Sequence, residues 1–203
     1  MTLSFKTVGV IGAGTMGAGI AQVAAQAGCT VKLFDAREGA ATTAIGRTSD
    51  TLNALVAKGR QTAEAAAGTI SRLHAAIDLA DFHDCDLVVE AIVEDLGAKQ
   101  ALFKSLESIC GEATILGTNT SSISITAIAN GLARPQNVVG MHFFNPAPLM
   151  PLVEVVSGHL TAPEAAARVE AASIEWKKTP VRCKSTPGRS EERRVGKECS
   201  SPC

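Results

Sequence analysis

The pair His142 and Glu154 is the part of the sequence best suited to acid–base chemistry. The two residues flank a loop with prolines at positions 146, 148 and 151, and the loop centre near Pro148 is equidistant from both. Prolines at this density force a loop. If the flanking strands pair as a hairpin, His142 and Glu154 face each other across the strands. A carboxylate beside an imidazole fixes its tautomer and stabilises its protonated form, as a general base requires. The alternative is a structural ion pair at the base of the loop.

Further polar side chains stand where predicted strands end. Glu90 and Glu94 follow one strand, and Asn119 and Ser121 follow the next one, in the run NTSS. Sheets of parallel strands bind ligands at the carboxyl ends of the strands, so we predict a ligand role for Asn119 and Ser121. The alternative is helix capping, which we expect of the serines at positions 122 and 124.

A glycine loop, GAGTMG at residues 12–17, follows a short apolar strand and opens a helix of small residues. Gly12 allows a sharp turn, Gly14 lets the backbone approach a pyrophosphate, and Gly17 lets the helix lie close to the sheet. The helix start at Thr15 and Met16 offers N–H groups to the phosphates. The pattern predicts a dinucleotide-binding loop, and the alternative is a glycine-rich turn without a ligand.

Asp35 closes the strand that follows this helix, 23 positions after Gly12. A carboxylate at this point can accept hydrogen bonds from the hydroxyls of an adenosine ribose. The sequence therefore places an adenosine-binding acid at the end of the second strand.

Alternating strands and helices must position these residues. Apolar or β-rich runs predict strands at residues 8–11, 73–79, 87–90, 115–117, 138–141, 152–156 and 181–183, beside the strand ending at Asp35. Helical patterns occur at residues 16–27, 38–59, 95–110, 123–131 and 162–178, with Thr161 as the last N-cap and a short helix or turn at 62–71. The sum is an α/β fold with a doubly wound, mostly parallel Rossmann-type sheet of roughly eight strands.

Charge and composition argue against several classes of protein. The net charge is −1 over 203 residues, so bulk electrostatics give no reason to expect nucleic acid or a membrane as a partner. No leader pattern and no bilayer-spanning apolar run occur, and we expect a cytoplasmic protein. The cysteines at positions 29, 85, 110 and 183 lack metal-ligand spacing; we expect reduced thiols and no metal.

Five motifs occur in the order found in one family: GAGTMGAGIA, DLVVEAIVEDLGAKQALF, NTSSISI, GMHFFNPAPLMPLVEVV and CKSTPG. With them, residues 5–188 resemble the NAD-binding domain of 3-hydroxyacyl-CoA dehydrogenases, and the bacterial 3-hydroxybutyryl-CoA type is a close match. The resemblance implies NAD-dependent oxidation of an (S)-3-hydroxyacyl-CoA to the 3-ketoacyl-CoA, or the reverse. It is compatible with fatty-acid, butanoate or phenylacetate breakdown.

The resemblance also implies roles for individual residues. His142 takes the proton from the 3-hydroxyl as hydride leaves carbon 3 for the nicotinamide, and Glu154 orients and supports the histidine. Ser121 hydrogen-bonds the substrate oxygen, and Asn145 shapes the site around the histidine.

On the cofactor side, Asp35 matches the adenosine-ribose acid and argues for NAD over NADP. Arg37 is a mild argument for NADP, because an arginine at this position could bind the 2′-phosphate of that cofactor. The positions that match residues lining the nicotinamide and its ribose are Glu94, Lys99 and Asn119.

Residues 189–203 depart from the family pattern. The family continues with a helical domain that supplies much of the acyl-CoA cleft and the dimer contact. Here seven of fifteen residues are charged, and Glu192 stands at the position of a substrate-contacting asparagine. We expect a cofactor domain at residues 1–188 and a disordered tail at 189–203 that is foreign to the fold, without zinc at Cys199 and Cys203. The family homodimer would be lost, and activity would be very low.

Two other functions remain open. The chain could be an NAD-binding fragment without catalysis. It could also be a 3-hydroxyacid dehydrogenase of the hydroxyisobutyrate type, which begins with a similar glycine loop but uses a catalytic lysine. The runs HFFNP and VEVV, which carry the His–Glu pair, argue against this second alternative.

Overall fold

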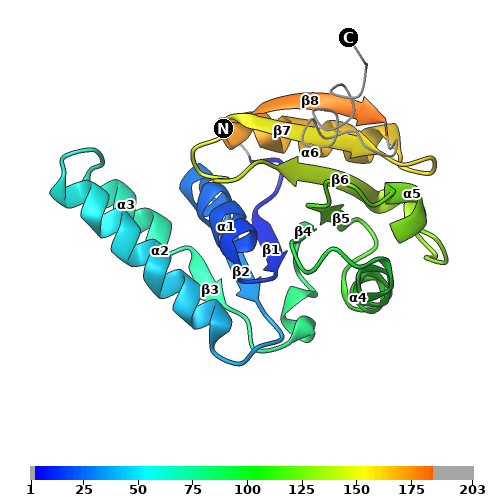
Figure 1. Ribbon diagram of the computed structural model, residues 1–203, viewed down its shortest axis with the longest axis horizontal. Helices are drawn as coiled ribbons and strands as arrows, with labels where there is room; N and C mark the ends of the chain where they lie inside the picture. Colours follow the sequence, from blue (N-terminus) through cyan, green and yellow to red (C-terminus); the bar gives the residue numbers. More distant parts are fainter. Residues whose placement is uncertain (1–2, 185–203) are drawn as a thin grey trace, which may run out of the picture.

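A computed structural model describes residues 3–184, which form one sheet with helices packed on it (Figure 1). Its strands are β1 (Thr7–Ile11), β2 (Thr30–Phe34), β3 (Leu73–Ala75), β4 (Leu87–Glu90), β5 (Ile115–Thr118), β6 (Val138–Phe143), β7 (Leu152–Ser157) and β8 (Thr179–Lys184). The order across the sheet is β3-β2-β1-β4-β5-β6-β7-β8, and every neighbouring pair is parallel except β6 and β7. The predicted doubly wound, mostly parallel α/β sheet is confirmed.

The strands are connected mainly by helices. These are α1 (Thr15–Ala27), α2 (Ala40–Ala57), α3 (Ala63–Ile70), α4 (Leu96–Ile109), α5 (Ile125–Ile128) and α6 (Pro163–Glu175), with short 3-10 segments η1 (Leu79–Phe82) and η2 (Pro135–Asn137). Local chemistry sets several ends. The Asp95 carboxylate accepts a hydrogen bond from the N–H of Ala98 and so starts α4. Gly28 ends α1 with a φ of 108°, a left-handed conformation that favours glycine.

The hydrophobic core lies in two layers, one on each face of the sheet. Successive side chains of a strand point to opposite faces. In β1, Val8 and Val10 therefore enter one layer and Ile11 the other, and in β4 Val89 and Val88 divide in the same way. Helices α1 and α6 supply the first layer, while α4 and α5 supply the second. Strands buried on both faces explain the nearly continuous apolar runs in the sequence.

The strand predicted at residues 73–79 is shorter than expected, because β3 ends at Ala75. Asp78 accepts a hydrogen bond from the N–H of Ala80, and Asp81 accepts one from the N–H of Ile77. This reciprocal capping starts η1 and overrides the β preference of the apolar residues before it. The helix predicted at residues 123–131 is likewise reduced to α5.

Thr161 does not cap α6 as predicted. Its hydroxyl donates a hydrogen bond to the carbonyl of Val138 at 2.7 Å and accepts one from the N–H of Gly158 at 2.8 Å. The N-cap position belongs to Ala162, which makes no side-chain cap. The Thr161 hydroxyl therefore bonds a distant residue in β6, although the local sequence pattern predicted that it caps the helix.

Lys177 has a φ of 58° and directly follows Trp176, the C-cap residue of α6. This left-handed position favours glycine, and another residue there costs about 1 kcal/mol. We expect Lys177→Gly to raise the free energy of unfolding by about 1 kcal/mol, which corresponds to a Tm increase of about 2–4 °C for a chain of this size. Thermal unfolding followed by circular dichroism measures it. Lys58→Gly is the matched control, because Lys58 caps α2 with a φ of −87° and should gain nothing. A lower Tm for Lys177→Gly would contradict the strain argument.

The predicted disordered tail at residues 189–203, including Glu192, Cys199 and Cys203, lies outside the described residues.

Candidate active site

His142 in β6 and Glu154 in β7 are direct partners in the antiparallel register. Nδ1 of His142 lies 2.9 Å from Oε2 of Glu154, and the two side chains are 9% and 12% exposed. A carboxylate can only accept a hydrogen bond, so Nδ1 carries a proton and Nε2 of the neutral ring is left as an acceptor. The ring of Phe144 lies against the imidazole, with centroids 4.7 Å apart. The facing arrangement predicted from the proline loop is confirmed.

A cavity of about 300 Å³ opens beside this pair. Seven of the residues predicted for the site line it: Met16, Glu94, Lys99, Asn119, Ser121, His142 and Asn145. A neighbouring cavity of about 440 Å³ is lined by Gly14 and Thr15, and Asn145 borders both cavities. Glu154 lies in neither wall, while its partner His142 lines the first cavity.

Asn119 joins two strand ends next to the histidine. Its Oδ1 accepts a hydrogen bond of 2.8 Å from the backbone N–H of Phe143, the residue after His142. Its own backbone N–H donates to the carbonyl of Glu90 at 2.8 Å. The ligand role predicted for Asn119 stays a prediction, and these contacts connect the residue to the ends of β4 and β6.

Glu94 is held at the cavity wall by several donors. Its Oε1 accepts hydrogen bonds from the hydroxyls of Thr120 and Ser122, and its Oε2 lies 3.4 Å from Nζ of Lys99. Burial by itself would raise the pKa of Glu94, but these hydroxyls and the Lys99 charge lower the pKa overall. Ser122 does not cap a helix as predicted: its hydroxyl donates to Glu94, and the N-cap of α5 lies at residue 124. Ser124 does cap α5.

The glycine loop is built so that α1 starts close to the sheet. Gly12 has a φ of 101°, and a Cβ there would lie 2.5 Å from the carbonyl oxygen of Ala91. A Cβ on Gly17 would lie 1.7 Å from the carbonyl oxygen of Gly12, whereas a Cβ on Gly14 would meet nothing within 4 Å. Helix α1 begins at Thr15 without a side-chain cap, so its first N–H groups can bond an anion. The loop fits the phosphates of a dinucleotide.

Asp35 lies directly after β2, where its carboxylate meets the glycine loop. Oδ2 accepts a hydrogen bond from the N–H of Ala13 at 2.7 Å, and Arg37 bonds both carboxylate oxygens at 3.0 and 3.2 Å. The Arg37 guanidinium, together with the backbone donors, lowers the pKa of Asp35 to about 2. The carboxylate is therefore ionised at neutral pH, and Arg37 already donates to both of its oxygens, in competition with any further donor. Sequence reasoning named both residues and missed their contact.

Removing this competition gives a testable expectation. We expect Arg37→Ala to tighten NADH binding about two- to fivefold, the range set by a weak exposed ion pair. The side chain of Arg37 is 75% exposed, so the change removes little else. Titration of NADH fluorescence measures the affinity. Arg182→Ala is the control, because Arg182 forms an exposed ion pair with Glu170 on another part of the sheet. Weaker NADH binding in Arg37→Ala would mean that Arg37 itself contacts the cofactor.

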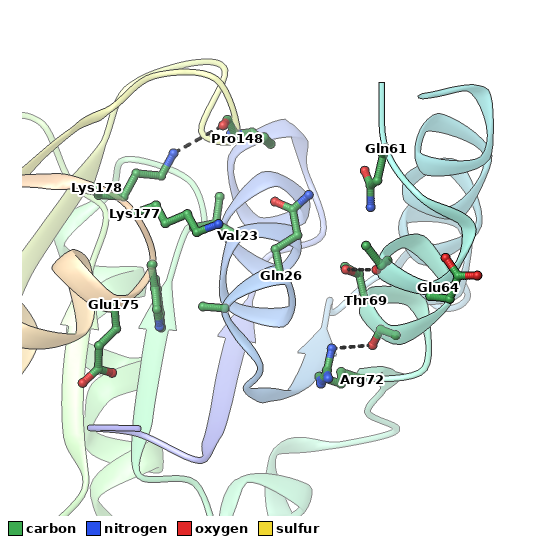
Figure 2. Close-up of a pocket in the computed structure, with 14 residues that line it drawn as sticks. Val23, Gln26, Gln61, Glu64, Thr69, Arg72, Pro148, Glu175, Lys177 and Lys178 are labelled. Atoms are coloured by element: carbon green, nitrogen blue, oxygen red, sulfur yellow. Dashed lines mark hydrogen bonds between the residues drawn. The ribbon is translucent and has the colours of Figure 1, made fainter. Parts of the chain in front are cut away.

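A third cavity, of about 450 Å³, lies between α1, α3 and the end of α6 and contains none of the residues predicted for the site (Figure 2). At its edge, Nζ of Lys178 donates to the carbonyls of Ala147 at 2.6 Å and Met150 at 2.8 Å, and Figure 2 shows it reaching Pro148. Burial lowers the pKa of Lys178. Lys178 thus holds the proline loop that joins the strands of His142 and Glu154. The contact of Lys178 with the proline loop was not predicted from the sequence, because a lysine that follows a helix is usually exposed to solvent.

Within residues 3–184, no group of three or more His, Cys, Asp or Glu side chains could hold a metal ion. In the same part of the chain, no helix is long and apolar enough to cross a membrane.

A glycine loop after β1, an acid after β2 and a His–Glu pair across β6 and β7 define a dinucleotide-binding domain of the kind used by oxidoreductases. Comparison with known families makes this specific. The chain belongs to the 3-hydroxyacyl-CoA dehydrogenase family, since residues 7–186 match the family's NAD-binding domain. NAD is therefore the cofactor, as predicted.

Individual relatives agree with this assignment. The chain is 50% identical to 3-hydroxyadipyl-CoA dehydrogenase of Escherichia coli over 93% of its own length and 40% of the relative. It is 48% identical to a probable 3-hydroxybutyryl-CoA dehydrogenase of Deinococcus radiodurans over 89% of its length and 64% of the relative. The crystal structure of 3-hydroxybutyryl-CoA dehydrogenase from Escherichia coli superposes with a TM-score of 0.89 at 50% identity, covering 91% of this chain and 39% of that one. The chain thus spans about two fifths to two thirds of these relatives.

Proposed function

We propose that this chain carries the cofactor and acid–base half of an NAD-dependent (S)-3-hydroxyacyl-CoA dehydrogenase. The observation that carries the proposal is the buried hydrogen bond between His142 Nδ1 and Glu154 Oε2, at the wall of the cavity shared with Asn119 and Lys99. The two relatives described above are named for 3-hydroxyadipyl-CoA and 3-hydroxybutyryl-CoA. We therefore propose a CoA ester with a hydroxyl on carbon 3 as the substrate class.

The mechanism follows from the arrangement of donors and acceptors. The glycine loop at residues 12–17 and Asp35 would hold NAD, which would supply the hydride acceptor for carbon 3. Because Glu154 accepts a hydrogen bond from Nδ1–H, Nε2 of His142 is the atom that takes the proton of the 3-hydroxyl. The resulting imidazolium stands beside the Glu154 carboxylate, which stabilises its charge. We propose that Ser121, which lines the same wall, hydrogen-bonds the oxygen as it becomes a carbonyl. The reverse reaction returns the proton from His142 to the oxygen.

The test is NADH oxidation in the presence of acetoacetyl-CoA, measured on this chain and on His142→Ala. Turnover that His142→Ala abolishes, with NADH binding retained, supports the proposal. NADH binding without any turnover in the unaltered chain would favour an NAD-binding module without catalysis. We expect slow turnover, because we propose that much of the acyl-CoA cleft and the dimer contact belong to the part of the relatives that this chain does not match.

A further inference from the structure

Glu90, the last residue of β4, is a carboxylate with no exposed surface. Its Oε1 accepts hydrogen bonds from Nζ of Lys99 at 2.5 Å and from the N–H of Ile92 at 2.7 Å. Its Oε2 accepts one from the hydroxyl of Thr118 at 2.8 Å. The acid thus joins the end of β4, the turn after it, the end of β5 and helix α4. The proton and hydride steps proposed above do not use it.

Lys99 is the partner through which Glu90 can reach the cavity. Its side chain is only 1% exposed, yet it contributes to the wall beside His142. Its ammonium lies between Glu90 and Glu94, at 2.5 and 3.4 Å. These two carboxylates account for two of its three N–H donors. Among the described residues, Glu90 is therefore the tighter of the two anchors of Lys99.

A buried ion pair is a costly way to pack a strand against a helix. Removing two charges from water can cost as much as their attraction returns, so apolar side chains of similar size would serve packing as well. Such pairs are informative where they fix the geometry of a neighbouring group. Here that neighbour is Glu94, which is 41% exposed and faces the same cavity.

We propose that Glu90 is a positioning residue of the cofactor site: it anchors Lys99 so that Lys99 offers a donor, and Glu94 an acceptor, to the hydroxyls of the nicotinamide ribose. The inference rests on the proposed function and on the role beside the nicotinamide ribose that the family resemblance implies for Lys99 and Glu94. Without Glu90, the ammonium is held only by the more exposed carboxylate and loses its fixed place at the wall.

The experiment is a double-mutant cycle in NADH affinity, measured by fluorescence titration on Glu90→Gln, Lys99→Gln and the double variant. We expect each single change to weaken NADH binding about tenfold, as expected for one hydrogen bond to a charged group. If Glu90 acts through Lys99, the double variant binds NADH no more weakly than Lys99→Gln alone. Independent, multiplying losses would overturn the proposal, as would wild-type affinity in Glu90→Gln.

A gentler variant keeps the test informative if Glu90→Gln fails to fold. Thr118→Val removes the hydroxyl that donates to Oε2 of Glu90 without changing a charge. We expect NADH binding about threefold weaker together with a lower Tm, because a buried carboxylate loses a donor. Thr118→Ser keeps the hydroxyl and should restore the affinity. Equal affinities of the valine and serine variants would overturn the proposal.

Glu170→Gln is the matched control, because it breaks the Glu170–Arg182 ion pair between α6 and β8 and should leave NADH binding unchanged. All of these measurements use NADH alone. If the chain binds NADH but does not turn over acetoacetyl-CoA, the proposed catalysis is contradicted. The role of Glu90 in NADH binding can still be tested with the same affinity measurements.

Discussion

Replacing Gly17 with alanine is expected to lower the free energy of unfolding by about 3 kcal/mol, the upper end of the usual cost of overpacking. The new Cβ would lie 1.7 Å from the carbonyl oxygen of Gly12, far inside the 3.0 Å that real Cβ contacts keep. This oxygen belongs to the backbone and cannot rotate away, so α1 must shift off the sheet. A Tm lower by about 6–12 °C follows for a chain of this size. The same shift displaces the N–H groups of the loop, so NADH binding should be lost.

Gly14→Ala separates the two effects in the same loop. A Cβ on Gly14 meets nothing within 4 Å, and its φ of −73° suits any residue, so the Tm should not change. If the cofactor phosphates approach this backbone, NADH binding should weaken about tenfold, the equivalent of one charge-assisted hydrogen bond. Thermal melts and NADH titrations of both variants decide the matter. Wild-type affinity in Gly14→Ala would show that the phosphates lie elsewhere.

The second large effect is expected from Glu154→Gln. A glutamine has almost the same shape, but its amide can donate as well as accept, so it no longer enforces a proton on Nδ1 of His142. It also removes the negative charge that stabilises the imidazolium formed during proton transfer. We expect turnover of acetoacetyl-CoA and NADH to fall by about a hundredfold or more, within the range of general acid–base contributions.

Two further measurements distinguish this role of Glu154 from a structural one. NADH affinity should stay close to the value of the unaltered chain, because Glu154 does not line the cavity. Nitrogen chemical shifts of the His142 ring should report one tautomer in the unaltered chain and a mixture in the variant. A single unchanged tautomer together with unchanged turnover would leave the pair as a structural contact at the loop base.

Much of the fold could be predicted because its determinants are local. Apolar runs such as residues 87–90 are buried on both faces of the sheet, and the sequence shows this directly as an uninterrupted hydrophobic stretch. The facing of His142 and Glu154 was also predictable, since equal distances from the loop centre fix the register of a hairpin. The errors at Thr161 and Ser122 arose because a hydroxyl can bond a distant partner as readily as a nearby helix start.

The sequence by itself determined the order of elements, the glycine loop, the acid after the second strand and the family to which the chain belongs. Only the tertiary structure decided what each charged group touches: Arg37 on Asp35, Lys178 on the carbonyls of the proline loop, and Glu90 on Lys99. The physical reason is the range of the interactions. Periodicity and turn chemistry act over a few residues and leave a pattern in the chain. Hydrogen bonds and ion pairs act over about 3 Å in space and leave no such pattern when they join separate segments.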